Sequence, residues 1–334
     1  MPGIQRIAIV GAGAWGTALA TVARRAGREV TIWARSPEIA VEINGSHSNS
    51  NYLPDIPLDP AIRAASDLAI LRESDAILWA TPAQYLRDIA AHAVAHLPDG
   101  VPVVLCCKGF EQGSGKLMTE VAAEALPRSP IAVLSGPTFA AEVARGLPTA
   151  VTLAIADSAL GREFVQALGT PAFRPYLSND LVGAEVGGAV KNVLAIACGI
   201  AIGRRLGDNA RAALLTRGLA EIMRLGLALG AEPATLMGLS GLGDLTLTCN
   251  GRQSRNLSLG IALSEGQKLA DYLAGRRTVA EGLSSAGAVV ARARSLGIEM
   301  PIAEAIDAIV NRGADIAETT SALLNRPFKE ETSI

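Results

Sequence analysis

A glycine-rich motif near the N-terminus constrains the fold more than any other feature. The β-rich run QRIAIV leads directly into Gly11-Ala12-Gly13-Ala14-Trp15-Gly16, and the helix-forming segment TALATVARRAG follows. In a G-x-G-x-x-G turn between a strand and a helix, the first glycine makes the tight turn, the second admits a pyrophosphate to the backbone, and the third permits close packing. The N–H groups at the helix start bind phosphate. The motif therefore predicts a dinucleotide-binding βα unit; the alternative is a βα turn with only a structural role.

Alternating strand and helix patterns continue through the first half of the chain. Apolar runs predict further strands, at residues 75–81, 102–108, 131–137 and 149–156. The first two are expected to be buried on both faces, with a helix over residues 82–97 between them. Beyond about Asp180 long Ala/Leu/Gly-rich segments predict helices alone. Because 334 residues exceed what one core usually supports, we expect an α/β dinucleotide-binding domain over residues 1–180 and an all-α domain over residues 181–334.

The segment after the predicted second strand bears on which dinucleotide binds. A strand over residues 29–34 is followed by Arg35 and Ser36, with no acidic residue before Glu38. NAD sites usually place an acid here for the ribose 2′-hydroxyl, whereas an arginine suits the 2′-phosphate of NADP. The sequence thus favours NADPH/NADP. An arginine can also stack on adenine, so NADH/NAD stays possible. A further alternative is that Arg35 is a solvated loop residue without a role in binding.

A single lysine stands out in a long apolar stretch. Between Val182 and Gly203 the only charged residues are Glu185 and Lys191. Burying an unpaired ammonium costs on the order of several kcal/mol, so such a lysine is paired, lies at an edge or serves chemistry. Burial also lowers a lysine pKa, which makes Lys191 a candidate proton donor near neutral pH. A structural Lys191–Glu185 ion pair is the alternative.

The segment GLGDLTLTCNGRQSRN, residues 241–256, carries a second set of polar residues. Asp244 follows a Gly-x-Gly loop, and Ser254 lies at or next to the N-cap of a predicted helix. Arg255 could hold a phosphate there, because guanidinium groups and free backbone N–H groups both suit that anion. Plain helix capping beside a surface arginine is the alternative. The dinucleotide motif and the lysine in its apolar stretch favour the phosphate site.

Composition and charge are those of a metabolic enzyme. The net charge of −2 gives no electrostatic basis for binding nucleic acid or an anionic membrane. Cys106, Cys107, Cys198 and Cys249 lack metal-ligand spacing, so we expect reduced core thiols and no metal. The chain enters a strand without a signal-like segment, and the uncharged run 193–203 is too short to span a bilayer. We therefore expect a cytoplasmic protein without integral membrane association.

Several sequence blocks along nearly the whole chain, taken in order, match one family pattern. They are GAGAWGTALA (11–20), NSNYLP (49–54), CKGFE (107–111), SGPTFAAEVA (135–144), VGGAVKN (186–192), LGDNARAALLTRGLAE (206–221), GLGDLTLTC (241–249) and SRN (254–256). In these blocks the chain resembles the bacterial NAD(P)-dependent glycerol-3-phosphate dehydrogenases. The resemblance implies a Rossmann-type domain, a helical C-terminal domain, and reversible reduction of dihydroxyacetone phosphate to sn-glycerol 3-phosphate, which supplies phospholipid synthesis.

The resemblance also implies roles for individual residues. Lys191 would exchange a proton with the C2 oxygen of the substrate, and Lys108 and Asp244 would orient Lys191 or hold its pKa. The implied substrate-binding residues are Lys108, Gly136, Thr138, Lys191, Asp244, Ser254, Arg255 and Asn256. The implied cofactor-binding residues are Gly11, Gly13, Ala14, Trp15, Gly16, Arg35, Lys108, Ala140, Arg255, Val279 and Glu281. We expect Lys108, Gly136 and Thr138 at the carboxyl ends of strands in the first domain, where ligands of such sheets bind.

The chain departs from the family pattern in two places. Ile202 replaces an expected acid before Arg204 and Arg205, and Ala280 and Ser285 also differ from the pattern. These changes leave every proposed catalytic position intact.

Two other functions stay open. One is another NADP-linked reductase with a helical C-terminal domain, of the ketopantoate or 6-phosphogluconate type; residues 241–256 favour the glycerol phosphate reaction instead. The other is a non-catalytic dinucleotide sensor, against which the set of charged residues argues because a sensor needs no proton donor. The apolar second domain makes a homodimer possible, although helices buried within one chain would show the same composition.

Overall fold

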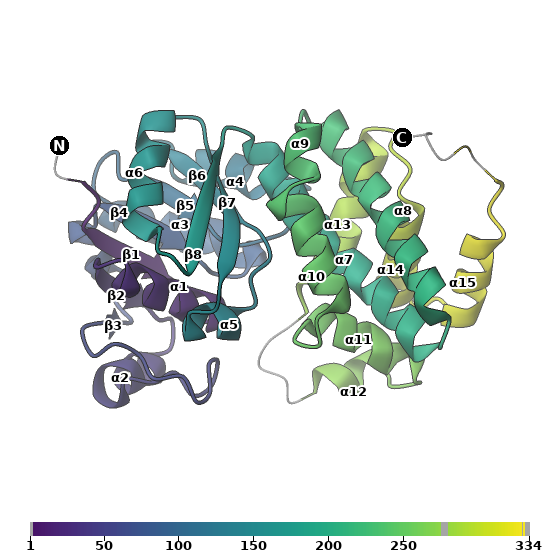
Figure 1. The fold of residues 1–334 in the computed structure, drawn as a ribbon, viewed down its shortest axis with the longest axis horizontal. Helices are drawn as coiled ribbons and strands as arrows, with labels where there is room; N and C mark the ends of the chain where they lie inside the picture. The colour runs from purple at the N-terminus through teal and green to yellow at the C-terminus, as the bar shows by residue number, and fades with distance from the viewer. Residues whose placement is uncertain (1–2, 275–279, 329, 331–334) are drawn as a thin grey trace. The chain divides into compact units, whose positions relative to one another are not determined.

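The computed structural model describes residues 3–274, 280–328 and 330, and the chain forms two compact units (Figure 1). The first unit consists of residues 1–107 and 118–181, and the second consists of residues 108–117 and 182–334. The segment 108–117 therefore packs with the second unit, although it follows a strand of the first.

The described part of the first unit is built on an eight-stranded sheet of order β3-β2-β1-β4-β5-β6-β7-β8. The strands are β1 (Arg6–Val10), β2 (Glu29–Trp33), β3 (Arg63–Ala65), β4 (Ala76–Trp79), β5 (Val103–Leu105), β6 (Ile131–Ser135), β7 (Thr149–Ile155) and β8 (Phe173–Ser178). All neighbours are parallel except β6 and β7, which are antiparallel. Because strand addition reverses direction beside β1, the crevice where such sheets bind ligands lies at its carboxyl end.

Helices cover both faces of this sheet. Its helical elements are α1 (Ala14–Arg25), α2 (Pro37–Ser46), η1 (Leu68–Glu73), η2 (Ala83–Tyr85), α3 (Leu86–Ala93), η3 (Val94–His96), α4 (Met118–Ala125), α5 (Ala140–Arg145) and α6 (Ser158–Leu168). Buried side chains of α1, α5 and α6 share one apolar cluster with the sheet, and those of α3 and α4 share another. Strand β4 is buried along its whole length, as its continuous apolar run predicts. The predicted α/β dinucleotide-binding fold is confirmed.

The structure corrects several details of the sequence prediction. The predicted helix over 82–97 is α3 flanked by two 3₁₀ turns. Cys106 and Cys107 follow β5 rather than belonging to it, although both are buried. Strands β3 and β8 lie at the two edges of the sheet. The sequence does not reveal them because one has three residues and the other contains a proline and exposed side chains, as edge strands commonly do.

The described part of the second unit is helical. Its elements are α7 (Leu181–Gly203), α8 (Gly207–Ala228), α9 (Pro233–Leu236), the π-helical turn η4 (Leu239–Gly243), α10 (Asp244–Asn250), α11 (Arg255–Ser264), α12 (Leu269–Leu273), α13 (Glu281–Ser295), α14 (Pro301–Arg312) and α15 (Ile316–Leu324). The prediction of helices alone is therefore confirmed for these residues.

Helix α7 is the core of the second unit. Every residue from Gly183 to Ala201 is buried. The helix is long and apolar enough to cross a membrane by length and composition, which the shorter uncharged run 193–203 did not indicate, but 89% of its most apolar window is buried inside the protein. Its apolar character is thus explained by burial among the other helices.

Glycines on α7 let neighbouring backbones approach closely. A Cβ atom on Gly187 would lie 2.5 Å from the carbonyl oxygen of Ser240, just before α10. A Cβ atom on Gly199 would lie 2.2 Å from the carbonyl oxygen of Leu257 and 2.9 Å from the Cα of Gly260, both in α11. Real Cβ contacts are not this short, so the glycines are required for α10 and α11 to pack as closely as they do on α7.

A buried carboxylate joins α8 to α14. Glu221 is 1% exposed and accepts hydrogen bonds from the N–H groups of Ile302 (2.7 Å) and Ala303 (3.1 Å), at the start of α14. Such N–H groups have no partner within their own helix. Burial raises the pKa of Glu221 to about 7, although the two N–H groups lower it.

This pKa predicts how stability depends on pH. Because the carboxyl pKa is higher in the folded than in the unfolded chain, the contribution of Glu221 is largest at low pH and is lost as pH rises through about 7. The free energy of unfolding of the wild-type chain should fall between about pH 4.5 and 7. In Glu221→Gln, whose side chain does not titrate, this fall should be smaller by roughly 1–3 kcal/mol. Denaturant unfolding across this range tests it; identical slopes for both chains would contradict it.

Candidate active site

The glycine turn after β1 has the geometry that a bound pyrophosphate needs. Gly11 has φ +117°, and a Cβ atom there would lie 3.0 Å from the carbonyl of Ala80. A Cβ atom on Gly16 would lie 1.8 Å from the oxygen of Gly11, so this close packing also requires glycine. Gly13, the N-cap of α1, faces open space instead. The residues present therefore fit a dinucleotide, with room for phosphate where the N–H groups of α1 begin.

Arg35 and Tyr85 lie near the carboxyl ends of two central strands. Arg35 follows β2, and its guanidinium carbon is 5.8 Å from the ring centroid of Tyr85, which follows β4. This distance is within the range of a cation–π contact. The indole Nε1 of Trp15 is buried and has no hydrogen-bond partner among the described residues.

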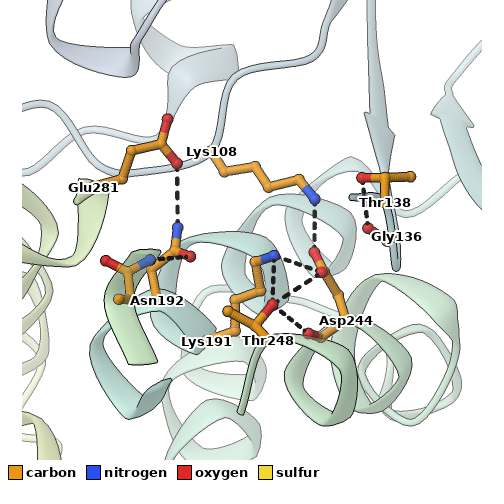
Figure 2. A network of polar contacts seen from close by, with 9 residues as sticks. Lys108, Gly136, Thr138, Lys191, Asn192, Asp244, Thr248 and Glu281 are labelled. Carbon is orange, nitrogen blue, oxygen red and sulfur yellow. Dashed lines mark hydrogen bonds and ion pairs between the residues drawn. The ribbon is translucent and has the colours of Figure 1, made fainter. Parts of the chain in front are cut away.

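A cluster of charged side chains lies within the second unit (Figure 2). Lys191, from the middle of α7, donates to Asp244 Oδ1 at 2.5 Å and to Thr248 Oγ1 at 2.9 Å. Lys108 donates to the other oxygen of Asp244, Oδ2, at 2.7 Å. The Asp244 side chain is fully buried, and those of Lys108 and Lys191 are 12% and 9% exposed. One carboxylate is thus shared by two ammonium groups.

The surroundings of Lys191 adjust its acidity. Burial lowers the Lys191 pKa to about 8; Asp244 opposes this shift, and the positive charge of Lys108 adds to it. A lysine with this pKa is protonated at neutral pH yet gives up its proton far more readily than a solvated lysine. The Thr248 hydroxyl accepts from Lys191 and donates to the Asp244 carbonyl at 2.7 Å, which fixes its orientation.

A chain of amide side chains lies beside this cluster. Asn192, next to Lys191, donates to Glu281 Oε2 at 3.3 Å (Figure 2). It also accepts from Asn256 Nδ2 at 2.9 Å. The N–H of Gly282 donates to Asn256 Oδ1 at 2.9 Å. Helix α7 is thereby connected to the starts of α11 and α13.

Ser254 is the N-cap of α11, as the sequence indicates. Its hydroxyl accepts from the N–H of Leu257 at 3.2 Å. Arg255 is therefore the first residue of the helix, at the end where backbone N–H groups favour an anion.

The structure groups the predicted substrate and catalytic residues by unit. Lys108, Lys191, Asp244, Ser254, Arg255 and Asn256 all belong to the second unit, together with the predicted cofactor residue Glu281. Gly136, Thr138 and Ala140 belong to the first unit with the glycine turn and Arg35. Gly136 has φ +149°, and a Cβ there would lie 3.0 Å from the Cα of Val151; Thr138 donates to the Gly136 carbonyl at 3.1 Å. Val279 lies outside the described residues.

One finding decides between the alternatives of the sequence analysis, and two differ from it. Lys191 pairs with Asp244, and the alternative Lys191–Glu185 ion pair is not formed among the described residues. Lys108 belongs to the second unit, although the sequence analysis expected it in the first, and its partner Asp244 is in the second unit too. Thr248 was missed; its spacing of four residues from Asp244, which puts both side chains on one helix face, was the available signal.

These features fit one class of protein, the nicotinamide-dinucleotide-dependent dehydrogenases that combine a Rossmann-type unit with a helical unit. The N-terminal pattern of NAD-dependent glycerol-3-phosphate dehydrogenase matches residues 6–161, and the C-terminal pattern matches residues 180–321. A glycerol-3-phosphate dehydrogenase [NAD(P)+] of Parvibaculum lavamentivorans is 58% identical over 98% of each chain. The chain therefore belongs to the NAD(P)-dependent glycerol-3-phosphate dehydrogenase family.

Solved structures agree with this assignment. A glycerol-3-phosphate dehydrogenase from Coxiella burnetii is 39% identical, has a TM-score of 0.93, and covers 97% of this chain and 100% of its own. A ketopantoate reductase from Ralstonia eutropha, which covers 96% of this chain and 100% of its own, is 18% identical with a TM-score of 0.56 and shares the fold alone.

The shared carboxylate predicts how Lys108 influences Lys191. Lys108→Met removes a positive neighbour, so the Lys191 pKa should rise above its value of about 8. NMR titration of ¹³C-labelled lysine measures this value directly. Lys268→Met is the matched control, because it removes the same charge from an exposed position before α12. A Lys191 pKa that stays constant or falls in Lys108→Met would contradict the electrostatic coupling.

Proposed function

We propose that this chain reduces dihydroxyacetone phosphate to sn-glycerol 3-phosphate with NAD(P)H, reversibly, and so supplies glycerol phosphate for phospholipid synthesis. The observation that carries the proposal is the buried Lys191–Asp244–Thr248 cluster in a chain of this family. When bound, the nicotinamide supplies the hydride for the ketone carbon.

Lys191 acts on the C2 oxygen of the substrate. An ammonium group has three N–H donors; Asp244 and Thr248 accept two, which leaves one for the oxygen on which negative charge develops. The same N–H stabilises that charge and then delivers the proton. In the direction of oxidation, neutral Lys191 takes the proton back.

Asp244 and Lys108 support this transfer. The carboxylate fixes Lys191 Nζ in one position. Burial lowers the Lys191 pKa, and the positive charge of Lys108 adds to this shift. As a second ammonium group at the cluster, Lys108 also binds substrate and cofactor oxygens. The single Asp244 carboxylate neutralises only part of the positive charge of the two ammonium groups. The cluster therefore still attracts a phosphorylated substrate.

The phosphate group of the substrate binds at the start of α11. Arg255 provides a guanidinium fork and Asn256 an amide, beside the N-terminal N–H groups of the helix capped by Ser254. Gly136 and Thr138 contribute from the first unit. Binding of the phosphate by these residues positions C2 of the substrate relative to Lys191.

The cofactor binds along the glycine turn, with NADPH preferred over NADH. The turn and Trp15 bind the pyrophosphate part of the cofactor. The other proposed cofactor-binding residues are Ala140, Lys108, Arg255, Val279 and Glu281. Arg35 faces the 2′-phosphate, and its contact with the Tyr85 ring supports this preference by limiting where the guanidinium can lie. A cytoplasmic location and a homodimer are further parts of the proposal.

A substrate panel tests the reaction. We expect NADPH oxidation at 340 nm with dihydroxyacetone phosphate and little with unphosphorylated dihydroxyacetone or ketopantoate. Lys191→Met should lower kcat by about 100-fold or more, with NADPH affinity nearly unchanged, because general acids typically contribute that much. Turnover of ketopantoate alone would support the rival reductase. NADPH binding without turnover of any ketone would support a sensor, and wild-type turnover by Lys191→Met would remove its catalytic role.

The cofactor preference has its own test. Arg35→Ala should raise KM for NADPH by roughly 10- to 100-fold and leave KM for NADH nearly unchanged, since charge-assisted bonds to phosphate contribute about 1.5–3 kcal/mol. Arg174→Ala on β8, which removes an exposed arginine from the same unit, is the matched control. Equal losses with both cofactors would show that Arg35 does not read the 2′-phosphate.

A further inference from the structure

The block NSNYLP contains a fully buried asparagine whose contacts reach the glycine turn. Asn49 lies between α2 and β3 in sequence and is 0% exposed. Its Nδ2 donates to the carbonyl oxygen of Ala12 at 2.9 Å and to Thr17 Oγ1 at 2.8 Å. One amide group therefore bridges the turn itself and the first turn of α1, on the two sides of Gly13.

Hydrogen bonds also hold the backbone at and just after Asn49. Its carbonyl accepts from the N–H groups of Tyr52 (3.1 Å) and Leu53 (2.8 Å). Glu42 on α2 accepts from the N–H of Ser50 at 2.7 Å, a bond that lowers the Glu42 pKa and keeps this carboxylate anionic. The amide thus has little freedom to follow the glycine turn if the turn moves.

The contact with Ala12 determines where the next N–H points. In a trans peptide the C=O of one residue and the N–H of the next point in opposite directions. Because the Ala12 carbonyl points toward Asn49, the Gly13 N–H points away from it. The N–H of Thr17 donates to the Gly13 carbonyl at 2.9 Å and begins the helical hydrogen bonding. The two bonds of Asn49 therefore fix the peptide before Gly13 and the helical turn after it.

We propose that Asn49 is the positioning residue of the phosphate-binding turn: it holds the Ala12–Gly13 peptide and the start of α1 in the orientation that binds the dinucleotide pyrophosphate. The inference rests on the proposed dinucleotide site. A neutral donor is required there, since an aspartate could not donate when ionised and would bring negative charge close to a bound phosphate.

Asn49→Leu tests the role, because it keeps a similar side-chain volume and removes both hydrogen bonds that Nδ2 donates. Asn44→Leu is the matched control: Asn44 exchanges two hydrogen bonds with the backbone of Ala64, at 2.8 and 2.9 Å, and both join α2 to β3. Isothermal titration with NADPH and with ADP-ribose measures binding without any reaction. We expect Kd to rise about tenfold or more for both probes in Asn49→Leu, and less than twofold in Asn44→Leu.

Two further readouts separate positioning from general stability. At saturating NADPH, Asn49→Leu should keep kcat within about threefold of wild type, because the turn is remote from proton transfer. Thr17→Val, a milder variant that leaves the bond to Ala12, should raise Kd by about threefold and is informative even if Asn49→Leu does not fold.

The outcomes distinguish this inference from the proposed function. If wild type binds both probes and Asn49→Leu binds them equally well, the inference is wrong and the dinucleotide site stands. Equal weakening by Asn44→Leu would also overturn it, because the loss would then reflect general loosening of this region. A wild-type chain that binds neither probe would overturn the dinucleotide site and the inference together.

Discussion

The Asp244 carboxylate is the interaction on which the second unit most depends. It is fully buried and joins α7, α10 and the segment 108–117 through two ammonium groups. Removal of one partner from such a cluster leaves an uncompensated buried charge, which is far more damaging than the loss of a surface ion pair. Lys191 is thus held by the core of the unit, and its position does not rely on a surface loop.

The glycines of α7 permit the close helix packing that places the residues of the proposed site. Gly187 permits the close approach of the backbone just before α10, which begins with Asp244. Gly199 permits the close approach of α11, whose first residue is Arg255. A larger side chain at Gly187 would move α10 away and lengthen the contacts of Lys191, and one at Gly199 would displace α11. The glycine-rich composition of this helix is therefore a condition for the site as well as for the core.

Local features were predictable from adjacent residues, whereas pairings over long sequence separations needed the family resemblance or the structure. The glycine turn, the Ser254 cap and the burial of Lys191 each follow from adjacent residues. The choice of Asp244 over Glu185 as the partner of Lys191 does not, because 53 residues separate that pair and only the packing of α10 on α7 brings it together. The same reason applies to Asn49 and Ala12, 37 residues apart. Edge strand β8 escaped prediction because Pro175 and exposed side chains obscure its pattern.

The glycine turn and the Lys191 cluster need different electrostatic surroundings. The glycine turn has to receive phosphate, so backbone N–H groups and the neutral Asn49 amide suit it, and no buried carboxylate touches the turn among the contacts described. In the proposed reaction Lys191 has to release a proton, which a fully stabilised ammonium does poorly. Asp244 raises its pKa and keeps it charged in the core, while burial and Lys108 lower it to about 8. With Asp244 alone and no burial, Lys191 would hold its proton too tightly to serve as an acid near neutral pH. The low exposure of α7 is therefore part of the chemistry.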